Sequence, residues 1–113
     1  MNKKQITLSI AILLTIQSGI TIAKNLPEGV IQEGSLANEK LISDAKMGVV
    51  SKMASLDCNK AESYSAYVTQ MPEGNVGERV WKELWLVTGC NNTYPINIRF
   101  QEDGAGGAFW NIK

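Results

Sequence analysis

The sequence predicts an α+β fold in which one N-terminal amphipathic helix packs on a four-stranded antiparallel meander sheet, with one disulfide. Three observations support this prediction. Apolar residues recur at steps of three and four between residues 36 and 56, which is the period of a helix. After residue 58 the period changes to two, in short segments bounded by turn residues. The third observation is a single pair of cysteines, Cys58 and Cys90, in a chain of 113 residues.

Residues 1–23 have the pattern of a secretory signal peptide. Lys3 and Lys4 precede an uncharged run from Ile6 to Ile16, and a small-residue cleavage site follows at residues 21–23. The run is shorter than the roughly 18 apolar residues of a spanning helix, and no cysteine lies near the cleavage site to accept a lipid. We therefore expect the peptide to be removed, leaving a mature chain from Lys24 in the periplasm or secreted, with no stable membrane anchor.

The two cysteines are expected to form a disulfide in that compartment. On the chain-entropy model, closing a loop of about 33 residues stabilises a fold by about 3 to 4 kcal/mol. Free thiols, metal ligation and an intermolecular bridge are the alternatives. The sequence has no histidine, and two thiolates supply half of a structural zinc site, so we expect no metal and no cofactor.

Residues 24–34 are expected to form a flexible arm before a single α+β domain at 35–113, because they combine glycine and proline with little apolar periodicity. Ser35 is a plausible N-cap for a helix of about 20 residues that starts at Leu36. Gly48 lies inside this helix and lowers its stability by about 1 kcal/mol relative to alanine. The apolar stripe either belongs to the core or docks into a partner's groove; it comprises Leu36, Leu41, Ile42, Ala45, Val49, Met53 and Leu56.

Four strands are expected after the helix, joined by short turns that contain glycine, proline and asparagine. The expected strands are Tyr64 to Met71, Glu78 to Thr88, Thr93 to Gln101 and Ala108 to Ile112. Pro95 cannot donate to a ladder, so it should lie at a strand start or an edge. In this arrangement the disulfide ties the end of the helix to the turn between the second and third strands.

The second strand has two partly apolar faces, and a helix can cover only one of them. Trp81, Glu83, Trp85 and Val87 alternate with Val80, Lys82, Leu84 and Leu86. Either the tryptophans belong to the core, or they face outward and bind a partner, as tryptophan does at interface hot spots. The second interpretation gives a candidate binding surface of Trp81, Glu83, Trp85, Arg99 and Trp110.

Catalysis is not predicted. Glu78, Glu83, Glu102 and Asp103 are the obvious carboxylates, but nothing in the sequence fixes an opposed pair of them. A cross-strand contact between Glu83 and Arg99 explains Glu83 more simply. Histidine, the usual base for a serine or cysteine nucleophile, is absent. The glycine-rich segment at residues 104–107 precedes a strand and not a helix, so it lacks the basis for phosphate binding.

The charge balance argues against nucleic acid as a binding partner. Removal of residues 1–23 takes away two of the 11 basic residues and none of the 11 acidic ones, so the mature chain has a net charge of −2. The basic residues are scattered singly along the sequence, without a stripe that could follow a phosphate backbone or an anionic membrane. Residues 91–93 fit a glycosylation sequon, which matters only in a host that glycosylates secreted chains.

The C-terminal half carries the motif R-x-W-x-E-x-W from Arg79 to Trp85, then Cys90, a Y-P strand from Tyr94 to Phe100 and the hairpin Gly104 to Phe109. This pattern resembles small uncharacterised bacterial periplasmic or secreted proteins. The resemblance covers about 35 residues and implies a location but no activity or site residues. The predicted helix and meander with one disulfide is also similar in outline to pilotin-like assembly factors of secretion systems.

These observations lead to one main functional hypothesis and two alternatives. The main one is a non-catalytic periplasmic or secreted module that binds a protein partner through the aromatic-rich sheet face. The first alternative is an enzyme inhibitor that inserts a loop, with residues 71–77 or 103–107 as candidates. The second alternative is a pilotin-like assembly factor.

Overall fold

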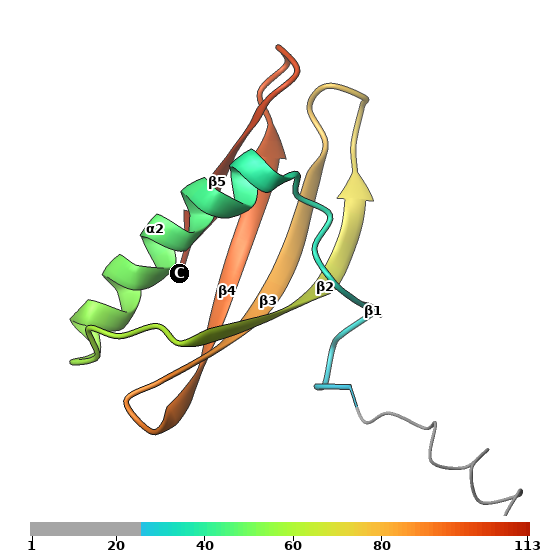
Figure 1. The fold of residues 1–113 in the computed structure, drawn as a ribbon. Coiled ribbons are helices and arrows are strands. Elements are labelled where there is room, and N and C mark those ends of the chain that lie inside the picture. Colours follow the sequence, from blue (N-terminus) through green and yellow to red (C-terminus); the bar gives the residue numbers. More distant parts are fainter. Residues whose placement is uncertain (1–25) are drawn as a thin grey trace, which may run out of the picture.

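One helix lies across one face of a five-stranded antiparallel sheet in the computed structural model of the protein, which describes residues 26–113 (Figure 1). The predicted signal peptide lies outside the described residues. The elements are β1 Gln32–Glu33, α2 Glu39–Ser55, β2 Ser63–Glu73, β3 Val80–Gly89, β4 Asn92–Glu102 and β5 Ala108–Ile112. Each strand is hydrogen-bonded to the next along the chain, in the order β1-β2-β3-β4-β5. The predicted α+β class and the meander are confirmed, but the prediction of four strands is wrong.

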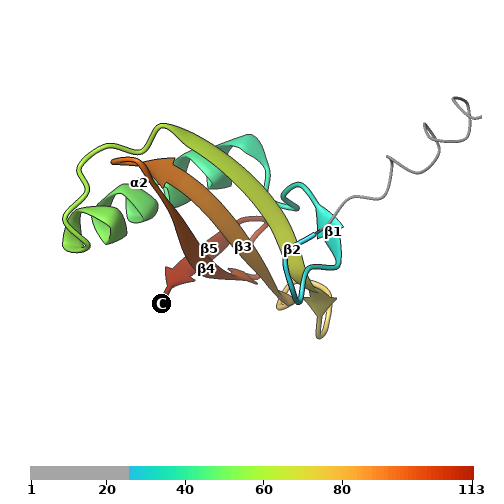
Figure 2. The ribbon, with the colours of Figure 1, turned by 90° about the horizontal axis from the view of Figure 1, so that it is seen from below.

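The extra strand, β1, comes from the segment that was expected to be a flexible arm. Gln32 lies opposite Val68 of β2, and the main-chain amides of Ile31 and Gly34 donate to carbonyls of β2 at 2.7 and 2.8 Å. Both β1 residues are exposed. This strand is therefore held by main-chain hydrogen bonds. Its sequence has no apolar alternation from which a strand could be predicted. Figure 2 shows it beside β2 at one edge of the sheet.

The helix begins three residues later than expected. Asn38, and not Ser35, is the N-cap, and its Oδ1 accepts a hydrogen bond from the amide of Leu41 at 2.8 Å. The core stripe is confirmed in part. Ile42 is partly buried, and four members at steps of four are buried: Leu41, Ala45, Val49 and Met53. Leu36 and Leu56 lie outside the helix and are exposed. None of the helices within residues 26–113 has the length and apolar character needed to cross a bilayer.

Gly48 marks the closest approach of the helix to the sheet. A Cβ atom at this position would overlap the indole ring of Trp110 and would lie 2.9 Å from Cδ1 of Ile112, both on β5. A glycine inside the helix therefore costs helix propensity but lets α2 sit directly on β5. This close contact explains why the helix contains Gly48, although glycine lowers the stability of a helix.

The disulfide between Cys58 and Cys90 is confirmed. Cys58 follows the helix, and Cys90 occupies the turn between β3 and β4, so the bond ties these two parts as expected. The turn has two residues with positive φ, 51° at Cys90 and 62° at Asn91, which is the type I′ geometry that matches the twist of a hairpin. Pro95 also lies as predicted, because β5 pairs with β4 only from Ile98 onward and leaves this end of β4 as an edge.

Candidate functional site

The tryptophans of β3 face the helix. Trp81 is 7% exposed, Trp85 is 2% exposed and Glu83 between them is completely buried. The Trp81 ring stacks on Phe100 of β4 with a centroid separation of 5.0 Å. These side chains therefore do not form an outward binding face. They are core residues, which was the alternative interpretation of the sequence. Helix α2 covers this face of the sheet because it supplies the matching apolar stripe.

Glu83 organises this part of the core through four hydrogen bonds. Its Oε1 accepts from Trp85 Nε1 at 2.7 Å, and its Oε2 accepts from Trp81 Nε1 at 2.8 Å. The same Oε2 also accepts from Ser35 Oγ at 3.0 Å and from the amide of Leu36 at 2.9 Å. Glu83 therefore joins the segment before the helix to the middle of the sheet, which is a structural role.

The predicted contact between Glu83 and Arg99 is wrong. In the register of β3 and β4, Glu83 lies opposite Ile98, while Arg99 lies opposite Lys82. Arg99 is thus on the other face of the sheet, where its Nη1 donates to Gln101 Oε1 at 3.0 Å. The remaining candidate, Trp110, is half-buried against the helix. The five candidate binding residues therefore do not form one surface.

Two hairpin loops lie side by side at one end of the sheet, and we call this end the loop end. It consists of residues 74–79 between β2 and β3 and residues 103–107 between β4 and β5 (Figure 1). The β3–β4 turn with Cys90 lies at the opposite end of the sheet. The first loop overlaps the segment 71–77 that the sequence suggested for loop insertion, and the second coincides with the segment 103–107. The predicted meander places both loops at the same end of the sheet.

Glu102 holds the two loops together. Its Oε1 accepts from the amides of Gly77 and Arg79, each at 2.9 Å, and from Arg79 Nε at 3.0 Å. Its Oε2 accepts from Arg79 Nη2 at 2.8 Å. The side-chain and main-chain hydrogen bonds from Arg79 lower the pKa of Glu102 to about 2, and the same pairing raises the pKa of Arg79. The carboxylate is therefore ionised at neutral pH and links β4 to the start of β3.

Each loop also has internal order. Asp103 Oδ1 accepts from the amides of Ala105 and Gly107 at 2.8 and 3.0 Å, which closes the β4–β5 loop over its own backbone. In the β2–β3 loop, Val76 is 85% exposed, the largest exposed fraction among the large apolar side chains of the described residues. Gly77 next to it has φ of 95°, a conformation that favours glycine. The loop end thus presents an apolar tip on a hydrogen-bonded base.

A hollow of about 400 Å³ lies beside the β4–β5 loop, between that loop and the first turns of the helix. Its lining includes Leu36, Lys40, Asp44, Asp103 and Gly107. The hollow extends the loop end toward the helix, so loops, helix start and hollow form one continuous side of the molecule.

Three of the carboxylates singled out in the sequence have separate surroundings. Glu83 is in the core, Glu102 is bound to Arg79, and Asp103 is engaged with its own loop. Within residues 26–113, no group of three or more histidine, cysteine, aspartate and glutamate side chains is arranged to hold a metal ion. Comparisons with protein-family models, with curated proteins and with solved structures found no match for this chain.

Proposed function

We propose that this protein is a non-catalytic module of the periplasm or the extracellular medium that binds an enzyme and blocks it with the loop end. The observation that carries the proposal is the set of hydrogen bonds to Glu102. This residue directly precedes the β4–β5 loop and accepts from Gly77 and Arg79 of the β2–β3 loop, so the two loops are held next to each other. Binding loops on a rigid scaffold are a common arrangement in protein recognition. Trp81 and Trp85 are in the core and Trp110 is half-buried against the helix, so the loop end is the better candidate contact surface.

The physical advantage of this arrangement is preorganisation. Ordering a mobile loop on binding costs about 0.5 to 1.5 kcal/mol for each immobilised side chain. At the loop end, the hydrogen bonds to Glu102 and Asp103 fix the backbone before any partner arrives. Val76 then supplies exposed apolar surface that would be buried in a cleft, and glycines on both sides of it allow close approach of the backbone.

The proposed location rests on the signal-peptide pattern and the disulfide. A disulfide persists in an oxidising compartment, and it strengthens a domain too small to form a large core. Exported hydrolases are the enzymes that such an inhibitor would meet.

The test is an inhibition panel with the purified, oxidised mature protein. Proteases and cell-wall hydrolases are assayed with fluorogenic substrates, and the most strongly inhibited enzyme is used to compare variants. Val76→Asp changes one loop and Ala105→Glu changes the other. Met47→Asp is the matched control, because Met47 is 71% exposed but lies on the helix.

We expect Val76→Asp to weaken inhibition at least about tenfold, since a charge would be buried without a partner in the complex. The control should inhibit like the wild type, and all variants should have the same melting temperature. Inhibition that is insensitive to both loop substitutions, or absent for every enzyme of the panel, would overturn the proposal.

A further inference from the structure

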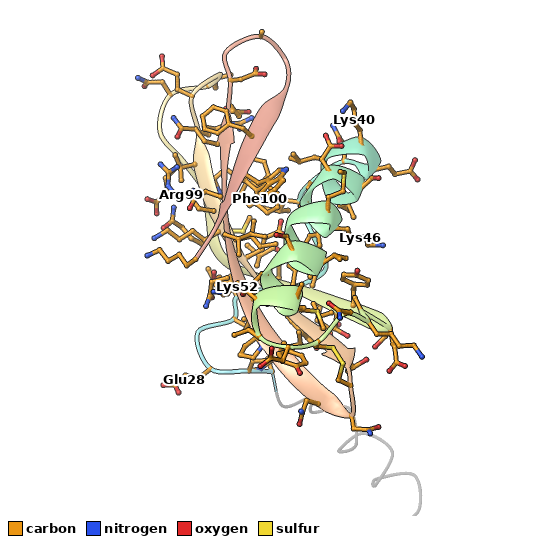
Figure 3. All side chains as sticks on the ribbon, turned by 90° about the vertical axis from the view of Figure 1, so that its left-hand side faces the viewer. Glu28, Lys40, Lys46, Lys52, Arg99 and Phe100 are labelled. Atoms are coloured by element: carbon orange, nitrogen blue, oxygen red, sulfur yellow. A yellow bond between two sulfur atoms is a disulfide. The ribbon has the colours of Figure 1, made fainter. Side chains whose placement is uncertain are left out.

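The sheet face opposite the helix carries three basic side chains close together. These are Lys82 of β3, Arg99 of β4 and Lys113 after β5, and we call them the basic cluster. All three line one hollow of about 460 Å³, together with Thr69, Glu83, Asn97 and Ile98. The carboxyl group of Glu83 is on the helix side of the sheet, where it binds Trp81 and Trp85. Figure 3 shows Arg99 on the side of the sheet away from the helix, which carries Lys40 and Lys46. The basic residues are scattered in the sequence, and the meander brings these three together.

Two members of the basic cluster are direct cross-strand neighbours. Lys82 lies opposite Arg99 in the β3–β4 ladder, and like charges placed in this way destabilise a sheet. Lys113 lies close by, because its amide donates to the carbonyl of Asn97 on β4 at 3.3 Å. The fold therefore keeps an arrangement that opposes its own stability. Such violations of local rules in natural proteins are expected at functional positions.

No side-chain carboxylate forms an ion pair with the basic cluster within the described part of the chain. The ion pairs formed among residues 26–113 involve Lys40, Lys60 and Arg79, and none includes a member of the basic cluster. The hydrogen bond from Arg99 goes to the neutral amide of Gln101. The basic cluster is thus a local positive region on a mature chain whose net charge is −2.

We infer that the basic cluster binds an acidic protein segment, in which aspartate or glutamate side chains meet Arg99, Lys82 and Lys113. The planar guanidinium of arginine suits carboxylates because it donates two parallel hydrogen bonds. Half-buried Leu84 and Leu86 lie on the same open face and would contact the apolar parts of such a segment. A nucleic acid fits less well, since phosphate-tracking proteins commonly use about six to ten contacts and a positive overall field. This site is separate from the loop end, so the inference does not rest on the proposed function.

The inference is tested with a fluorescein-labelled hexaglutamate peptide, titrated with the full mature protein and followed by fluorescence anisotropy. Arg99→Gln and Lys82→Gln should each weaken binding at least about fivefold, because each removes a charge-assisted contact. Lys46→Gln, on the helix side, is the matched control and should change the affinity by less than about twofold. Binding should also weaken steeply between low salt and about 0.5 M salt.

Three further measurements decide between interpretations. The melting temperature of Lys82→Gln should equal or exceed that of the wild type, because a like-charge contact is removed; a clear decrease would mean that Lys82 stabilises the fold. Val76→Asp should bind the peptide normally, and loss of binding would move the site to the loop end. No binding of the peptide, equal binding by all variants, or tighter binding of a single-stranded oligonucleotide of equal charge would each overturn the inference.

Discussion

Replacement of Glu83 by glutamine should strongly destabilise the protein, although it changes neither the size nor the shape of the side chain. The carboxylate accepts from two indole N–H groups, one on each oxygen. An amide has one oxygen and one NH₂ group, so it can accept from only one indole and must direct its own donor at the other. Exchanging the two ends of the amide moves this conflict from one tryptophan to the other and does not remove it.

The expected magnitude follows from the burial of the two indoles. Trp81 and Trp85 are 7% and 2% exposed, so water cannot replace the lost partner easily. A buried donor left unsatisfied costs about 1 to 3 kcal/mol. With the amide oxygen at the Oε2 position, where three donors converge, Trp85 Nε1 and the new NH₂ group face each other, and both lack an acceptor. We expect a decrease of about 2 to 4 kcal/mol in the free energy of unfolding, a large fraction of the roughly 4 to 13 kcal/mol typical of a domain of this size.

The assay is equilibrium unfolding in urea at pH 7, followed by far-ultraviolet circular dichroism so that changed tryptophan emission does not interfere. Glu62→Gln is the matched control, because Glu62 is an exposed glutamate in a loose ion pair of 3.7 Å with Lys60. The control should change the free energy by less than about 0.5 kcal/mol. A loss below about 1 kcal/mol would refute the argument that Glu83 organises the core.

Three further predictions concern stability. Replacing Cys58 and Cys90 together by serine should lower the free energy of unfolding by about 3 to 4 kcal/mol, measured by unfolding in urea. An unchanged free energy of unfolding in the double variant would contradict this prediction. Gly48→Ala should destabilise by about 1 to 3 kcal/mol despite the better helix propensity, because the new methyl group overlaps the ring against the helix; a gain in melting temperature would show that helix and sheet can separate without cost. The pKa of Glu102 falls from its usual 4.5 to about 2 in the folded protein, so its contribution is fully present above about pH 4.5 and is lost as the pH falls toward 2. The stability of Glu102→Gln should therefore depend less on pH in that window than that of the wild type, and identical acid profiles would contradict the pairing with Arg79.

Most of the fold could be predicted because its signals are local. The change of apolar period from helical to twofold, and the turn residues between the strands, are readable in any short window of the chain. The features that were missed depend on distant partners. The hydroxyl of Ser35 donates to a glutamate 48 residues away and accepts from the amide of Ala37, while Asn38 caps the helix. Strand β1 is held by its backbone alone, which no side-chain pattern reports.

The candidate site was harder to predict for a related reason. Alternation shows which side chains of β3 share a face, but it does not say which face the helix covers. The choice follows from the fit between the helix stripe and the two tryptophans around Glu83, which exists only in the folded protein. The turn residues and the meander order indicated both loops of the loop end, but the contact between Arg79 and Glu102 that joins them is made only in the folded protein. In the sequence alone, Glu102 is one carboxylate among several.

The measurement that most directly tests the account is the ratio of inhibition constants for Val76→Asp and the wild-type protein against the most strongly inhibited exported hydrolase. Lys82→Gln, on the open sheet face, serves as a second control. The account predicts an inhibition constant at least about tenfold higher for Val76→Asp, with wild-type values for Lys82→Gln and unchanged melting temperatures. Equal inhibition by Val76→Asp and the wild type, together with weakened inhibition by Lys82→Gln, would show that the enzyme is bound by the sheet face and would contradict the assignment of the loop end as the inhibitory surface.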